Sequence, residues 1–156
     1  MVVPPVRRIR ARSAKGRRII ITLRRAQIEE IFSHARAARP SECCGLIGGR
    51  GRVAEALYRL RNVARDSLKT YEAAPEELFA AQRQMRERGE QILAIYHSHP
   101  NSAEPVPSET DVRLAFYPSA VYLIVGFTAE GLGVLRAFHI SERERRWTAA
   151  EFSIVE

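Results

Sequence analysis

The sequence predicts an α/β fold: a single domain built on a mixed β-sheet that is flanked by helices. The chain has 156 residues, of which 46% are hydrophobic, and this suits one compact domain with a core of useful size. Short runs rich in β-branched and apolar residues alternate with segments whose apolar residues recur at helical spacing. No internal repeat interrupts this order, which indicates a sheet with helices packed on it.

The first sixty residues predict one helix and three strands. The expected strands span residues 18–23, 43–49 and 53–60. Residues 24–38 carry apolar side chains at helical spacing, and Pro40 ends that helix. The glycines within residues 48–51 are a turn signal, so the second and third strands should form a hairpin.

A loop and a second helix are expected next. Residues 61–74 are mixed and polar, which predicts a loop with a short extended piece near Tyr71. Pro75 suits a first helical turn and Gly89 suits the position just past a helix end, so residues 76–88 should be helical.

The remaining chain predicts a buried strand with a loop and a short helix behind it. Residues 91–99 form a near-continuous apolar run, which is typical of a central strand covered on both faces. Three prolines predict a loop at 100–107, and residues 108–116 predict a short helix. Further strands are expected at 121–127 and 131–140, with a helix turn or an edge strand at 147–155.

The basic charge of the chain is concentrated in its first segment. Residues 1–18 hold seven basic residues and no acidic one, and the remaining chain is formally neutral with 18 of each sign. Such a segment is expected to be a disordered tail, and residues 19–156 to be the folded domain. The tail could also contact nucleic acid or an acidic partner, and this alternative stays open.

The cysteines and the hydropathy favour a cytoplasmic protein. Cys43 and Cys44 are adjacent, so they cannot staple the fold, and they suit a reducing compartment as buried strand residues. No apolar run is long enough for a transmembrane helix, and the short run Ile19–Ile21 is no signal-peptide core.

One segment predicts a metal site. His97 and His99 end the expected central strand and, because side chains alternate along a strand, point to the same face. Asp111 lies in the first turn of the next helix, behind a loop long enough to fold back over the strand end. Two histidines and one carboxylate leave a fourth tetrahedral position for water, as in catalytic zinc sites. Zinc in such a site lowers the pKa of the water to about 7 and polarises a carbonyl.

Two more residues could complete a hydrolytic site. Glu42 directly precedes the expected strand 43–49, where its carboxylate could accept a proton from the water and pass it to a leaving amine. Ser108, three residues before Asp111, could support an oxyanion through its hydroxyl. Taken singly, these motifs have plainer interpretations, because His-x-His pairs are common and Ser108 with Asp111 is also a good capping box.

The joint pattern resembles the JAMM (MPN+) metalloprotease motif. That motif has a glutamate, then His-x-His-Pro, then Ser-x-x-Asp, and the matching residues here are Glu42, His97 to Pro100, and Ser108 with Asp111. The Glu-Cys-Cys-Gly-Leu stretch from Glu42 is similar to that of the small prokaryotic stand-alone members. One departure is visible: eight residues separate His99 from Ser108, where the family usually has seven.

The resemblance implies a fold, a site and a substrate class. It implies a cytidine-deaminase-like α/β fold, one zinc ion on His97, His99 and Asp111, Glu42 as general base, and Ser108 as oxyanion support. The implied reaction is hydrolysis of the peptide or isopeptide bond after the C-terminal glycine of a ubiquitin-like or sulfur-carrier protein. An extended Gly-Gly tail could add to a sheet edge, and residues 61–74, with Asn62 and Tyr71, are the expected edge.

Other function classes stay open. Some relatives of the family are scaffolds without metal, and a nucleic-acid-associated role could use the basic tail. A zinc deaminase would need His-x-Glu and Pro-Cys-x-x-Cys patterns, and neither is present. The sequence leaves open the carrier protein, the leaving group and the oligomeric state, a homodimer included.

Overall fold

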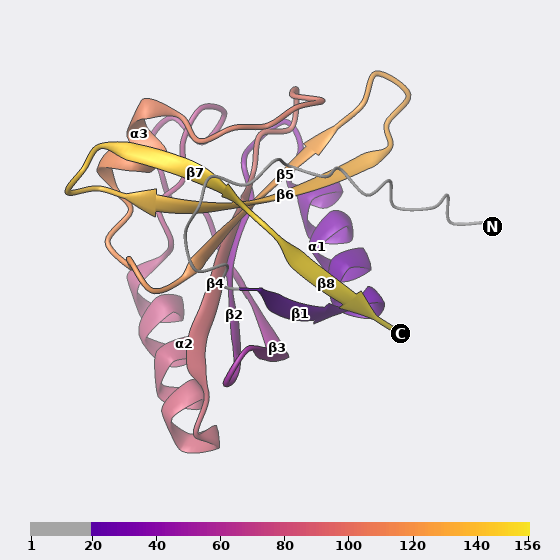
Figure 1. Cartoon of the computed structure of the whole chain (residues 1–156). Coiled ribbons are helices and arrows are strands. Elements are labelled where there is room, and N and C mark those ends of the chain that lie inside the picture. The colour runs from indigo at the N-terminus through magenta and orange to yellow at the C-terminus, as the bar shows by residue number, and fades with distance from the viewer. Residues whose placement is uncertain (1–19) are drawn as a thin grey trace.

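The computed structural model describes residues 20–156 of the chain (Figure 1). The predicted tail, residues 1–18, lies outside this described range. The elements are β1 (Ile21–Arg24), α1 (Arg25–Ala38), β2 (Cys44–Arg50), β3 (Val53–Leu60), α2 (Pro75–Arg88), β4 (Gln91–Ser98), α3 (Glu109–Arg113), β5 (Val121–Phe127), β6 (Gly133–Ser141), β7 (Arg146–Ala150) and β8 (Phe152–Val155).

The described strands form one mixed sheet in the order β7-β6-β5-β4-β2-β3-β1-β8. β2 is antiparallel to both β3 and β4, whereas β4 is parallel to β5. β4 therefore lies at the centre, and Tyr96, His97 and Ser98 near its end are almost fully buried. The prediction of a mixed sheet with a buried central strand is confirmed.

The last two strands, β7 and β8, are consecutive in the chain but stand at opposite ends of this strand order. β7 pairs with β6, and β8 pairs in parallel with β1, with only residue 151 between β7 and β8. In Figure 1 they form one long bent ribbon that crosses the molecule and ends beside β1. Of the two predictions for residues 147–155, the edge strand is therefore correct and the helix turn is wrong.

The two long helices cover opposite faces of the sheet. Buried residues of α1, among them Ile28 and Ile31, join a core with Tyr96 and Leu123. Ala81 and Met85 of α2 join a second core with neighbouring strand residues of the other parity, such as Ile95. Each helix thus buries one apolar stripe, as its spacing predicts.

Local sequence explains where α2 begins and ends and why α3 is short. α2 has proline at its first position and ends at Gly89, which adopts the left-handed conformation with φ 69°. α3 is shorter than the predicted 108–116 because it ends at Arg113. Phe116 is 67% exposed, so continuing the helix to it would bury little apolar surface.

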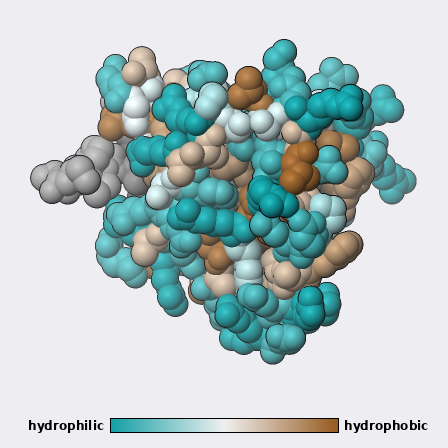
Figure 2. All heavy atoms as spheres, turned by 180° about the vertical axis from the view of Figure 1, so that it is seen from behind, coloured by the Kyte–Doolittle hydropathy of each residue, from teal (hydrophilic) through white to brown (hydrophobic). Residues whose placement is uncertain are grey.

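The face of the molecule seen from behind is mainly hydrophilic (Figure 2). Hydrophobic residues occur on it only in small separate groups (Figure 2), which is usual for a globular protein. None of the helices in residues 20–156 has both the length and the apolar character that a membrane span requires.

Candidate metal centre

The site forms where the start of β2 meets the end of β4. These strands are antiparallel, with Cys44 paired to His97. The backbone N–H of Cys43 donates to Oγ of Ser98 at 2.8 Å, and the N–H of Ser98 donates to the carbonyl of Cys43 at 3.2 Å. Ser98 is fully buried, so these two hydrogen bonds are shielded from water. This pairing of the strands places Glu42, one residue before Cys43, beside the histidines.

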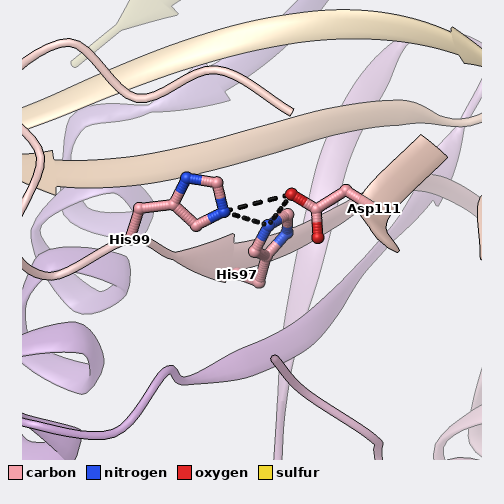
Figure 3. A group of neighbouring side chains, drawn as sticks. All are labelled: His97, His99 and Asp111. Carbon is pink, nitrogen blue, oxygen red and sulfur yellow. Dashed lines mark hydrogen bonds and ion pairs between the residues drawn. The ribbon is translucent and has the colours of Figure 1, made fainter. Parts of the chain in front are cut away.

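Three side chains converge at this point (Figure 3). Nε2 of His97, Nε2 of His99 and Oδ2 of Asp111 are each 3.1 Å from the other two. His97 comes from β4, His99 follows that strand directly, and Asp111 comes from α3. The sequence predicted these three residues as a ligand set, and the structure brings them together.

Hydrogen bonds alone cannot satisfy this triangle. Each Nε2 carries at most one proton, so at most two of the three edges can be hydrogen bonds and the third then brings like partial charges together. A cation coordinated by all three atoms removes the conflict. Ligand atoms around tetrahedral zinc, at bond lengths of 2.0–2.1 Å, are separated by about 3.3 Å. The observed 3.1 Å separations therefore fit such an ion.

The protonation states also fit a metal site. Burial lowers the pKa of His97, which keeps its ring neutral. Burial alone would raise the pKa of Asp111, but hydrogen bonds from His97 and His99 outweigh it and hold that pKa far below its ordinary value. A neutral imidazole and an ionised carboxylate are the forms that bind metal ions.

The start of α3 fixes Asp111 in place. Oγ of Ser108 accepts a hydrogen bond from the backbone N–H of Asp111 at 3.0 Å, and Oδ2 of Asp111 accepts one from the N–H of Ser108 at 2.8 Å. This is the capping box that the sequence predicted. The carboxylate oxygen that faces both histidines is therefore also the one that caps the helix.

Glu42 lies next to the triangle as a buried acid. Its Oε1 is 3.9 Å from Nε2 of His99, and only 4% of the residue is exposed. Oε2 is buried and, within the described residues, has no hydrogen-bond partner. Burial raises the pKa of Glu42 to about 7, against a smaller opposing effect of His99. A carboxyl group with such a pKa can exchange protons near neutral pH.

Tyr71 and Asn62, which the sequence predicts at a sheet edge for a Gly-Gly tail, contact residues of the site itself. The ring of Tyr71 stacks on the ring of His97, with centroids 4.6 Å apart and an angle of 27° between the planes. The side chain of Asn62 donates to the carbonyl of Glu42. No sequence periodicity indicates either contact, because both arise from the path of the loop at 61–74.

The two cysteines take no part in the triangle. Both are buried, and burial raises the pKa of Cys43 to about 11 and that of Cys44 to about 12. Such thiols are poor nucleophiles, as expected for buried residues.

Comparison with known proteins identifies relatives over most of the described domain. The model of the family described as prokaryotic homologs of the JAB domain matches residues 24–147. A desampylase of Haloferax volcanii is 38% identical over 102 residues, which cover 62% of this chain and 73% of that protein. A CysO-cysteine peptidase of Mycobacterium bovis is 31% identical over 127 residues, which cover 81% and 86% of the two chains.

A solved structure agrees with these sequence relatives. The solution structure of a protein from Desulfitobacterium hafniense superposes with a TM-score of 0.76 and is 37% identical in sequence. The match covers 88% of this chain and 94% of the other. The matched region, residues 24–147, contains both the sheet core and all the candidate site residues.

Proposed function

Because the chain belongs to the family of prokaryotic homologues of the JAB domain, we propose that it is a zinc peptidase of the JAMM type. Its proposed reaction is hydrolysis of the peptide or isopeptide bond after the C-terminal glycine of a ubiquitin-like or sulfur-carrier protein. The observation that carries the proposal is the triangle of ligand atoms from His97, His99 and Asp111 beside the buried acid Glu42. The names of its relatives, a desampylase and a CysO-cysteine peptidase, support the reaction class.

The proposed ligands of one zinc ion are His97, His99 and Asp111. Two histidines and a carboxylate leave one tetrahedral position open, as catalytic zinc sites do. Zinc bound there would polarise the carbonyl of the scissile bond and activate a water molecule as the nucleophile. Asp111 would contribute a negative charge towards such an ion, and the capping box holds its carboxylate in place.

Glu42 is the proposed general base and acid. Its buried carboxylate lies 3.9 Å from His99, where it can accept a proton from the attacking water and return it to the leaving amine. Ser108 is proposed to support the oxyanion. Its oxygen already accepts from the N–H of Asp111, so its own O–H remains free to donate towards a substrate oxygen.

Burial around the triangle indicates a thin substrate segment. The side chains of His97 and Asp111 are 0% and 6% exposed, whereas that of His99 is 17% exposed. The triangle is thus open to solvent mainly beside His99. A Gly-Gly tail has no side chains beyond its backbone and can reach such a recessed site, which supports the proposed substrate class.

The test combines metal analysis with cleavage. Zinc content per chain is measured by mass spectrometry for the wild type, His97→Ala and His99→Ala, with His139→Ala on β6 as the matched histidine control. Cleavage is measured on a ubiquitin-like carrier whose Gly-Gly terminus is joined to cysteine or to a lysine side chain, with and without a chelator. We expect about one zinc per chain and chelator-sensitive cleavage in the wild type and the control, with both lost in the two ligand variants. Zinc bound equally by all four proteins, or cleavage that resists the chelator, would contradict the proposal.

A further inference from the structure

The loop between β3 and α2 contacts the site on the side of Glu42. Its two ends run antiparallel, because the N–H of Val63 donates to the carbonyl of Glu72 and the N–H of Ala74 donates to that of Arg61. Asn62 and Ala73 form a β-bridge between them. Residues 61–63 therefore pair with 72–74 inside the loop itself.

The side chain of Asn62 uses every hydrogen bond that it can make in this loop. Its Nδ2 donates to the carbonyls of Glu42 and Thr70, each at 3.0 Å. Its Oδ1 accepts from the N–H of Ala64 at 2.9 Å and from the N–H of Glu72 at 3.0 Å. An amide has two donor protons and two acceptor lone pairs, so its capacity is filled. No other side chain of this size offers two donors and an acceptor in this arrangement.

Two hydrogen bonds hold the backbone of Glu42, one at its carbonyl and one at its N–H. Its carbonyl accepts from Asn62, and its N–H donates to the carbonyl of Ser67 at 2.8 Å. Both partners belong to the same loop. The position of the Glu42 backbone therefore depends on the loop, and the loop conformation depends on the three bonds that Asn62 makes within it.

The same bonds hold Tyr71 over a proposed metal ligand. Thr70 and Glu72, on either side of Tyr71, are both bonded to Asn62. The ring between them stacks on the fully buried ring of His97 at 4.6 Å. One amide thus fixes two neighbours of the triangle: the acid beside His99 and the ring on His97.

We propose that Asn62 is a positioning residue, which aligns Glu42 for proton transfer and holds Tyr71 against His97. This inference rests on the proposed peptidase function, because it assigns a catalytic consequence to the alignment of Glu42. A displacement of a reacting group by about 1 Å can lower a rate on the order of 100-fold, so a single lost anchor is enough to be measured.

Asn62→Asp is the sharpest variant. It is isosteric and keeps the acceptor for Ala64 and Glu72, but it removes both donors and faces the carbonyls of Glu42 and Thr70 with a carboxylate oxygen. We expect kcat on the Gly-Gly substrate to fall on the order of 100-fold, with KM changed less than about threefold and with zinc content unchanged. Gln84→Glu, an exposed amide on α2, makes the same charge change and should leave kcat unaltered.

A measurement on the wild type keeps the inference testable if this variant does not fold. The chain has a second asparagine, Asn101, which is exposed. The side-chain N–H protons of Asn62 should exchange with solvent much more slowly than those of Asn101 in an NMR exchange experiment. Equal exchange of the two amides would overturn the inference.

Four outcomes of the kinetic test are decisive. A kcat within about twofold of the wild type, or a loss of activity matched by a loss of zinc, would overturn the positioning role. A selective fall in kcat with zinc retained would support it. A zinc-loaded wild type that cleaves no Gly-Gly substrate would instead refute the proposed function, while the amide exchange of Asn62 would still report on the anchor.

Discussion

Replacing Glu42 by glutamine should have opposite effects on activity and on stability. The change keeps the size of the side chain, removes its charge and removes its capacity to accept a proton. General bases contribute on the order of 100-fold to 10,000-fold to a rate, so kcat should fall within that range while zinc content stays constant.

The stability effect follows from the burial of the carboxyl group. Burial raises the pKa of Glu42 from an ordinary 4.5 to about 7 in the metal-free protein. Below pH 4.5 both the folded and the unfolded chain bind the proton, and stability is unaffected. As the pH rises from 4.5 to 7, the unfolded chain loses its proton while the folded chain keeps it, so the native state becomes progressively less stable until both are ionised above pH 7. At about 1.4 kcal/mol for each tenfold difference, the loss reaches at most about 3 kcal/mol above pH 7.

The assay is urea unfolding of the chelated protein at pH 8 and near pH 4.5, with cleavage measured separately on the zinc-loaded protein. Glu42→Gln should be more stable than the wild type at pH 8, by up to about 3 kcal/mol, and nearly equal to it near pH 4.5. Glu130→Gln, at an exposed position, is the matched control and should change neither quantity. A variant that retains activity within about threefold, or that is less stable than the wild type at pH 8, would refute the reasoning.

Two further substitutions test how the site is held. Ser108→Ala removes the oxygen that accepts from the N–H of Asp111, so it should lower the free energy of unfolding by about 1 kcal/mol and also reduce cleavage. Ser108→Thr keeps a hydroxyl and should recover most of the stability, as urea titrations of the two variants can measure. Gly126→Ala would place a methyl carbon 2.0 Å from the carbonyl oxygen of Ser102, so it should displace the loop after His99. Zinc content, measured by mass spectrometry, should therefore fall. An unaltered zinc content would show that the loop does not hold the ligands.

The fold could be predicted where the pattern is local. The helical spacing of Ile28, Ile31 and Ala35 is a property of one segment, and so is the apolar run of β4. The pairing of β8 with β1 is different, because it joins residues more than 120 positions apart. No local pattern determines such a partner, and this explains why residues 147–155 could not be assigned to one element.

The candidate site divides in the same way. His97 and His99 share a face because of strand alternation, and Ser108 with Asp111 forms a capping box, so both pairs could be predicted from spacing. The stacking of Tyr71 on His97 could not. It depends on the loop that crosses from β3 to α2. The four hydrogen bonds of Asn62 go to backbone groups, three in this loop and one at Glu42, and every sequence has such groups.

The extra residue between His99 and Ser108 is accommodated within the loop that joins them. The N–H of His99 donates to the carbonyl of Val125, and the N–H of Phe127 donates to that of Ser102, so the loop is tied to β5 at its start. Farther on, Arg136 of β6 donates to the carbonyl of Pro105 at 3.2 Å. The loop reaches α3 from these fixed points, and Asp111 still lies 3.1 Å from both histidines. Because β5 and β6 hold His99 and the loop at these points, and the capping box holds Asp111, loop length can vary between them without a change in the triangle. The spacing of a ligand motif is therefore a weaker constraint on this site than the strand ends and the helix cap that hold its three atoms.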